Sequence, residues 1–196
     1  MSEPARSEER ILDVRVGSAT NALQPVLAAE RTFAAGPAQW LSLLLVAAAA
    51  VAADQVTKQL VARTLALGDS VELAGPFSIH HVHNSGIAFG LFSSATSIVI
   101  ALTGIAVGCL VLFFARSGRR HPLLPVALGL VLGGSVSNLL DRVRLGYVTD
   151  FLDLAYWPSF NLADTFIVVG VGLLFVSFVA ADRSSPRLGT LPLSRS

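Results

Sequence analysis

The run from Ala95 to Ala115 contains no charged residue, and as an α-helix it is long enough to cross the hydrocarbon core of a bilayer. The composition also favours a membrane protein, because 53% of the residues are hydrophobic, 14% are charged and the mean hydropathy is +0.66. An ordinary soluble domain is more polar than this. The formal net charge of +1 gives no basic face for nucleic acid, so no nucleic-acid partner is expected.

Three further apolar runs bring the predicted membrane helices to four, at about residues 38–66, 94–115, 122–141 and 164–182. The first helix must continue past Asp54 and Lys58 to reach spanning length, which places both residues near one membrane face. Their spacing of four puts them on one side of the helix, where the carboxylate and the ammonium can neutralise each other. A purely structural ion pair, which only lowers the cost of placing two charges near the membrane, explains this spacing equally well.

Four spans place the N terminus, the 116–121 loop and the C terminus on the same side of the membrane. All three segments carry arginines, which favour the cytoplasmic side. We therefore predict an all-α membrane protein with both termini cytoplasmic, in which residues 38–182 form the membrane domain. Residues 1–37 mix charges with Gly and Pro and are predicted to be a flexible tail rather than a secretory signal. Residues 183–196 are predicted to be a cytoplasmic tail.

The segment at residues 68–92 differs from the apolar runs, because it contains Gly, Pro and short alternating stretches. This pattern predicts a small β-rich cap outside the lipid, on the extracytoplasmic side. Within the segment, Gly86 permits a tight turn that could aim Asn84 toward the membrane domain. An ordinary surface turn explains the same residues equally well.

Two residue types that often bind metals are present, but their pattern is weak. His80, His81 and His83 resemble a metal cluster, yet no Cys or HExxH partner accompanies them, so no metal site is predicted. The single cysteine, Cys109, lies in an apolar run and is expected to pack as a small hydrophobic residue.

Polar residues are concentrated between Gly133 and Asp164, between two apolar runs. Gly134, Asn138 and Arg142 are spaced by four and form one stripe near the outer end of the third helix. Small residues at such spacing usually pack helices together, whereas the asparagine and the arginine need polar partners. Asp141 stands next to an arginine, and a structural ion pair is its most economical role.

Asp150 and Asp164 lie 14 residues apart, and a chain that folds back between them could bring them together. Two carboxylates in a partly desolvated site share a proton near working pH, as in an aspartic protease, where one takes a proton from water and the other hydrogen-bonds the substrate carbonyl. Asp164 could instead be a helix N-cap. The spacing alone does not choose between Asp150 and Asp153, and it does not exclude Asp141.

A protein of another class would also place carboxylates in the membrane, namely a small transporter or proton-relay protein. Such a protein would distribute charged groups along its spans. Residues 95–115 and 165–181 carry none, and the polar residues gather near one face. This distribution disfavours a transport pathway.

Five short motifs occur in a fixed order across the four predicted helices: DQVTK at 54–58, NSGIAFG at 84–90, GGSVSNLLDR at 133–142, VTDF at 148–151 and FNLAD at 160–164. Together they resemble the lipoprotein signal peptidase (signal peptidase II) family over about residues 40–182. The resemblance implies an aspartic endopeptidase of the bacterial inner membrane, active near the outer face. Its substrates would be prolipoproteins, cleaved just before a diacylglyceryl-modified cysteine.

The resemblance also implies roles for individual residues. It assigns the catalytic pair to Asp150 and Asp164, without a metal or an organic cofactor. It implies a substrate site lined by Asn84, Gly86, Asn138, Arg142 and Asn161. It implies supporting roles for Asp54, Lys58, Gly134, Asp141 and Ala163. The expected partners are lipid-modified prolipoproteins and membrane lipids, and the chain is expected to act as a monomer.

Overall fold

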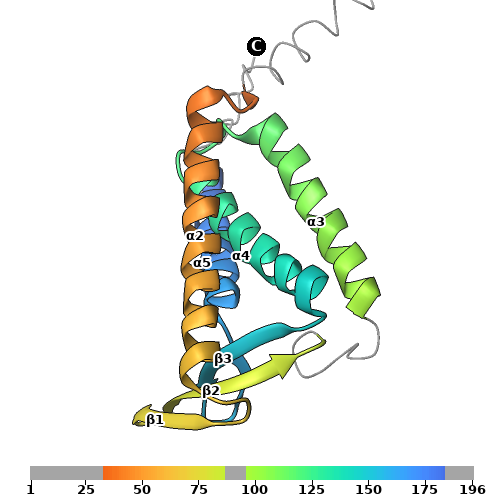
Figure 1. Ribbon diagram of the computed structural model, residues 1–196. Coiled ribbons are helices and arrows are strands. Elements are labelled where there is room, and N and C mark those ends of the chain that lie inside the picture. The colour runs from red at the N-terminus through yellow and green to blue at the C-terminus, as the bar shows by residue number, and fades with distance from the viewer. Residues whose placement is uncertain (1–32, 87–95, 184–196) are drawn as a thin grey trace, which may run out of the picture. The chain divides into compact units, whose positions relative to one another are not determined.

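The computed structural model describes residues 33–86 and 96–183, which form four long helices and one sheet (Figure 1). The helices are α2 (Pro37–Thr64), α3 (Thr96–Ser117), α4 (Leu124–Leu145) and α5 (Leu162–Arg183). Each is long and apolar enough to cross a membrane. The four helices predicted from the sequence are therefore present. Most of the predicted N-terminal tail and nearly all of the predicted C-terminal tail lie outside the described residues.

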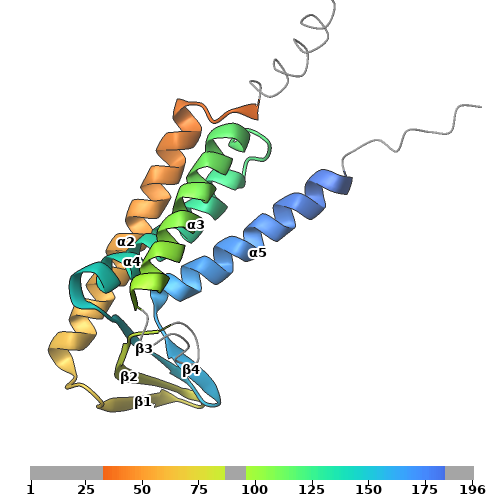
Figure 2. The same ribbon diagram turned by 90° about the vertical axis from the view of Figure 1, so that its right-hand side faces the viewer.

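A four-stranded antiparallel sheet lies at one end of the helices, as Figures 1 and 2 show. Its strands, in the order β1-β2-β3-β4, are β1 (Ser70–Ala74), β2 (Phe77–Asn84), β3 (Val148–Leu154) and β4 (Trp157–Phe160). The sequence predicted strands only at 68–92, so the second hairpin, between α4 and α5, was missed. The fold is thus four apolar helices with one sheet, whose strands come from the α2–α3 and α4–α5 connections.

Helix α4 is the central helix, and it packs against α2, α3 and α5. About two thirds of its membrane-length segment is buried, a far larger share than in the other three helices. Glycines on α4 permit this packing. A Cβ at Gly133 would lie 2.7 Å from the backbone oxygen of Ala47 on α2, and a Cβ at Gly134 would overlap the backbone oxygen of Ala163 on α5. These contacts confirm that the small residues pack the helices together.

The hydrophobic core lies at the end of the helices away from the sheet (Figure 1). There Phe114 of α3 is fully buried and packs edge-on against Trp40 of α2, with 4.9 Å between ring centroids. The core is completed by Leu43, Leu124, Leu128 and Leu132. Cys109 does not join it, because its side chain is exposed, so the expectation that this thiol is packed was wrong. With the apolar core at one end, the buried polar residues lie nearer the sheet.

Two backbone features place polar residues at that end. Helix α4 ends at Leu145 because Gly146 adopts φ +84° and donates its N–H to the carbonyl of Arg142, a left-handed helix cap. The chain then enters β3, which pairs with β2 so that Asn84 lies opposite Val148 and Val82 opposite Asp150. The register therefore carries Asp150 next to the end of β2.

Candidate active site

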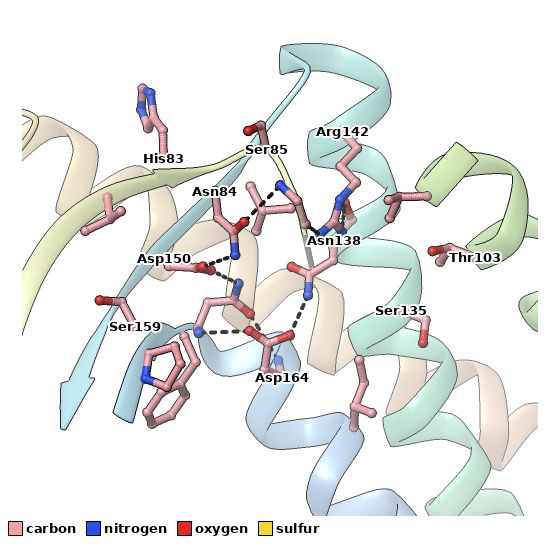
Figure 3. Close-up of a pocket in the computed structure, with 18 of the residues that line it drawn as sticks. His83, Asn84, Ser85, Thr103, Ser135, Asn138, Arg142, Asp150, Ser159 and Asp164 are labelled. Atoms are coloured by element: carbon pink, nitrogen blue, oxygen red, sulfur yellow. Dashed lines mark hydrogen bonds between the residues drawn. The ribbon is translucent and has the colours of Figure 1, made fainter. Parts of the chain in front are cut away.

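Asp150 on β3 and Asp164 in the first turn of α5 lie on one buried polar cluster (Figure 3). Asp150 is only 3% exposed and Asp164 is half-buried. Asn161, which is fully buried, joins them, because its side-chain amide donates to Asp150 Oδ1 at 2.7 Å and its backbone N–H donates to Asp164 Oδ2 at 3.2 Å. The structure therefore brings together the two aspartates selected by the resemblance.

Asp164 is not the N-cap that one interpretation of the sequence suggested. Helix α5 begins at Leu162, so the cap is Asn161, whose Oδ1 accepts the N–H of Asp164 at 3.0 Å. Asp164 accepts the N–H of Asn161 in return. This reciprocal pattern is a capping box, and it holds the third residue of the helix in one orientation. The local structure of the helix start thus positions the carboxylate.

The amide orientation of three asparagines is fixed, because the Oδ1 of each accepts from a group that can only donate. Asn84 Oδ1 accepts the backbone N–H of Gly86 at 3.0 Å, so its amide nitrogen must point the other way, toward Asp150 Oδ2 at 2.8 Å. Asn161 is fixed in the same manner by the N–H of Asp164. Asn138 Oδ1 accepts from the ammonium of Lys58 at 2.8 Å, so its amide donates to Asp164 Oδ1 at 2.9 Å. Each carboxylate oxygen of the two aspartates therefore receives one N–H donor.

The surroundings of Asp150 favour its protonated form more than water would. Burial raises the pKa of Asp150 from 3.8 to about 6, and the charge of Asp164 acts in the same direction. The hydrogen bonds from Asn84 and Asn161 and the charge of Lys58 oppose the rise. A carboxyl with this pKa exchanges a proton near neutral pH, which is what general acid–base chemistry requires.

Arg142 and Gly86 connect α4 to the end of β2. Arg142 Nη2 donates to the carbonyl of Gly86 at 2.6 Å, while the N–H of Gly86 holds Asn84. The turn after β2 is thus held from both sides, and Asn84 points inward, as one interpretation of the sequence anticipated. An ion pair between Asp141 and a neighbouring arginine was expected, but the structure does not show one. Asp141 pairs instead with Lys58 at 2.7 Å.

A second polar cluster lies beside the first and is centred on Lys58, which is 4% exposed. Its ammonium contacts Asp54 at 2.6 Å and Asp141 at 2.7 Å. Asp54, which is fully buried, also accepts the N–H of Ala163 and the hydroxyl of Ser137. These bonds tie α2 to α4 and to the start of α5.

One member of this cluster was missed by sequence reasoning. Gln55 Nε2 donates to Asp141 Oδ1 at 2.7 Å and to Ser137 Oγ at 3.0 Å. The available signal was an uncharged polar residue inside a predicted membrane helix, where a polar side chain needs a partner on another helix. Ser137, which accepts the bond from Gln55, also donates its hydroxyl to Asp54 Oδ2 at 2.7 Å.

The histidines on β2 have other neighbours. His83 stacks on Tyr147 with 3.7 Å between ring centroids, and burial, followed by the charge of His81, lowers its pKa. His81 Nδ1 lies 3.0 Å from the carbonyl of Leu65, and His80 lies 3.7 Å from Asp153. Within residues 33–86 and 96–183, no three His, Cys, Asp or Glu side chains are placed to hold a metal ion.

A cavity of about 960 Å³ opens in front of the two aspartates. Both Asp150 and Asp164 line it, whereas Asp141 and Asp153 do not. Its polar end includes Asn84, Asn138 and Arg142, which are labelled in Figure 3. Away from them its wall is mostly apolar and includes, on α3 and α5, Ile98, Val99, Leu102, Ala106, Ile167 and Val168. A chain segment with an apolar part and a polar backbone end would match such a cavity.

Asp150 and Asp164, one buried and one half-buried, share Asn161 as a partner and face one cavity. Such a carboxylate pair is typical of an aspartic peptidase, and here it lies among membrane-length helices. Comparison with known proteins agrees. The sequence model of the family described as Signal peptidase (SPase) II matches residues 46–180. The chain therefore belongs to the signal peptidase II family and is an aspartic peptidase.

Individual relatives give the same result. The lipoprotein signal peptidase of Symbiobacterium thermophilum is 46% identical over 149 residues, which cover 73% of this chain and 97% of the relative. That of Dehalococcoides mccartyi is 42% identical over 144 residues, covering 70% and 89%. A solved bacterial membrane enzyme superposes with a TM-score of 0.69 at 32% identity, covering 76% of this chain and 93% of that one.

Proposed function

We propose that Asp150 and Asp164 are the catalytic pair with which this chain removes the signal peptide from lipid-modified prolipoproteins. The activity itself, that of a lipoprotein signal peptidase, follows from membership of the signal peptidase II family. The roles of individual residues are inferred from the geometry. The observation that carries them is that these two aspartates line the cavity and share Asn161 as a hydrogen-bond partner.

In the proposed reaction the pair shares one proton. The ionised carboxylate takes a proton from a water molecule, whose oxygen attacks the carbonyl carbon of the scissile peptide bond. The protonated carboxyl donates its proton to the carbonyl oxygen, which gives a neutral tetrahedral intermediate. When the C–N bond breaks, the departing amine of the lipidated cysteine takes up a proton and the new carboxyl group remains on the signal peptide. The pair returns to its starting state with one proton, so no further reactant is needed.

The asparagines keep the two carboxyl groups in place for this exchange. Each amide donates to a carboxylate oxygen and is itself held by a fixed donor, so the aspartates do not have to reorganise when a proton moves. Asn84, Gly86, Asn138, Arg142 and Asn161 form or support the polar end of the cavity, where the substrate backbone would bind. Asp54, Lys58, Gly134, Asp141 and Ala163 support the helix contacts beneath it.

The sheet end of the molecule is proposed to face the outside of the cytoplasmic membrane. Arg116, Arg119 and Arg120 lie at the other end of α3, and positively charged segments favour the cytoplasm. The sheet then forms an extracytoplasmic cap, and both termini are cytoplasmic. The signal peptide, whose N-terminal end stays inside, would lie along the apolar wall of α3 and α5 with its cleaved end at the aspartates. Because one chain supplies every group at this site, we expect a monomer to be active.

The test is cleavage of a lipid-modified prolipoprotein by the purified full chain, compared among wild type, Asp150→Asn and Asp164→Asn. Each variant should lower the rate by about 10²- to 10⁴-fold, because one member of the acid–base pair is lost. Asp153→Asn is the matched control, since Asp153 lies on the same strand but outside the cavity, and it should retain near wild-type activity.

Full activity of either Asp150→Asn or Asp164→Asn would contradict the assignment of the pair. Equal cleavage of prolipoproteins with and without the lipid would contradict the proposed substrate. Activity lost on addition of a chelator would indicate a metal-dependent peptidase instead.

A further inference from the structure

Two hydroxyl groups line the apolar part of the cavity, Thr103 on α3 and Ser135 on α4. Both side chains are half-buried, and Figure 3 shows them on two different helices beside the same cavity. The other lining residues that α3 contributes are apolar: Ile98, Val99, Leu102 and Ala106. Sequence reasoning gave neither hydroxyl a role, and the proposed reaction uses neither.

Neither hydroxyl has a hydrogen-bond partner among the described residues. The hydroxyls of Thr57, Thr64 and Ser177 each bond back to a carbonyl three or four residues earlier, as helical hydroxyls in apolar surroundings often do. Thr103 and Ser135 make no such bond and instead face the cavity. Their bonding capacity is therefore free for a molecule that occupies the cavity.

The two hydroxyls lie deeper than the aspartates. Ser135 precedes Asn138 by one turn of α4, about 4.5 Å farther from the sheet, and Asn138 is the residue that contacts Asp164. Thr103 lies seven residues inside α3 from its start at Thr96, about 10 Å along the helix axis. At this depth water is scarce, so an interhelical hydrogen bond is the available way to satisfy a hydroxyl.

We propose that Thr103 and Ser135 hydrogen-bond the signal helix of the substrate about one turn before the cleaved bond, and that they select substrates with a serine or threonine there. This inference rests on the proposed function, which places the signal peptide in this cavity with its N-terminal part deeper in the membrane. A hydroxyl on the signal helix would meet two hydroxyls on the enzyme, each of which can donate and accept. An aliphatic side chain of the same size would leave both unsatisfied.

The test uses pairs of lipid-modified prolipoproteins that differ only by threonine or valine, at each position from two to six residues before the cleaved bond. Cleavage by the purified full chain is measured as kcat/KM for each pair. Wild type should prefer threonine by about 3- to 20-fold, the range that membrane hydrogen bonds provide, and only at one or two neighbouring positions. The Thr103→Val/Ser135→Ala double variant should lose this preference, because its kcat/KM for the threonine substrates falls relative to its kcat/KM for the valine substrates.

Ser177→Ala is the matched control, because Ser177 lies on α5, bonds back to Leu173 and does not line the cavity. It should keep the threonine preference. Thermal unfolding in detergent checks that the double variant is folded, and a double variant that cannot fold is replaced by the two single substitutions.

The inference is overturned if wild type shows no preference at any position, or if the double variant keeps it. In either case the lipid-modified substrates would still be cleaved, and Asp150→Asn would still be inactive, so the proposed function would stand. Failure of wild type to cleave any of these substrates would instead overturn the proposed function, and this inference with it.

Discussion

Two neighbouring clusters in this protein are built from the same parts but have different chemistry. Each contains two buried or half-buried aspartates that share one polar partner. In the first cluster Lys58 lies between Asp54 and Asp141, at 2.6 and 2.7 Å. In the second the partner is the neutral amide of Asn161, which lies between Asp150 and Asp164. The partner's charge is the main difference.

A cation and a neutral amide give the two clusters different electrostatics. The ammonium of Lys58 compensates the charge of both carboxylates through two ion pairs. Amide donors only partly offset burial, so Asp150 has a raised pKa, about 6. Among the described residues no cation lies within ion-pair distance of Asp150 or Asp164. A charged partner therefore makes a structural cluster, and a neutral partner leaves a pair that can exchange protons.

Asn138 joins the two clusters. Its oxygen accepts from Lys58 and its amide nitrogen donates to Asp164. The lysine thus orients the asparagine without forming an ion pair with Asp150 or Asp164. This connection predicts that loss of Lys58 disturbs the orientation of Asn138 and, through it, the hydrogen bond to Asp164.

The largest loss in the free energy of unfolding is expected from Lys58→Met. The substitution leaves Asp54 and Asp141 buried without their cation, and breaking a buried pair in this way typically costs about 3–5 kcal/mol. Unfolding of the purified chain in detergent, followed by denaturant titration, measures the loss. Arg63→Met is the control, since Arg63 is exposed on the same helix and should change stability little. A loss below about 1 kcal/mol for Lys58→Met would show that the first cluster does not depend on its cation.

A smaller change in the free energy of unfolding is expected when the pH is varied, because Asp150 exchanges a proton. Between pH 3.8 and about 6 the folded chain keeps a proton on Asp150 that the unfolded chain releases, because burial raises the pKa in the folded state. Stability should therefore fall as the pH rises through this window and stay lower above it, by up to about 3 kcal/mol. Asp150→Asn should abolish this component of the pH dependence.

The measurement is denaturant unfolding in detergent at pH 4, 5, 6 and 7 for wild type and Asp150→Asn. Asp153→Asn serves as the control on the same strand and should retain the wild-type pH dependence. If wild type and Asp150→Asn showed the same pH dependence, Asp150 would not carry the expected proton in the folded chain, and the comparison would fail.

The sequence predicted the helices and most of the site residues, for identifiable reasons. Apolar runs of membrane length give helices directly, and charged residues at their ends have few possible roles other than contact with one another. The pairing of Asp54 with Lys58 followed from their spacing. Spacing did not choose Asp150 and Asp164 over Asp141 and Asp153. That choice required the resemblance to a family.

What the sequence did not predict depends on long-range packing. The segment at Val148–Phe160 was expected only to fold back as a short loop. Its strands were missed because the pairing of β3 with β2 depends on residues far away in the sequence. The partner of Asp141 was also missed, since Lys58 lies on another helix whereas the arginines are close in sequence. Such contacts arise from how α2 packs on α4, which local spacing does not encode.

The smallest loss in the free energy of unfolding is expected from Gln55→Leu. This variant best distinguishes the roles of the two clusters, because it should change stability without changing the pH profile of cleavage. Gln55 donates to Asp141 and Ser137 and has no hydrogen bond to Asn138, Asp150 or Asp164. Loss of its hydrogen bond to a charged group should lower the free energy of unfolding by about 1.5–3 kcal/mol, because the buried carboxylate loses a donor. Gln59→Leu, an exposed glutamine one turn later on the same helix, is the matched control and should change stability little.

The decisive readout for Gln55→Leu is cleavage as a function of pH. Lys58 keeps its contacts with Asp54, Asp141 and Asn138 in this variant, so the orientation of Asn138 is preserved and the amide still donates to Asp164. The pH profile of kcat/KM should therefore match that of wild type even though the protein is less stable. A profile displaced toward higher or lower pH would mean that the two clusters titrate as one unit, and that the charge of the partner is not what distinguishes them.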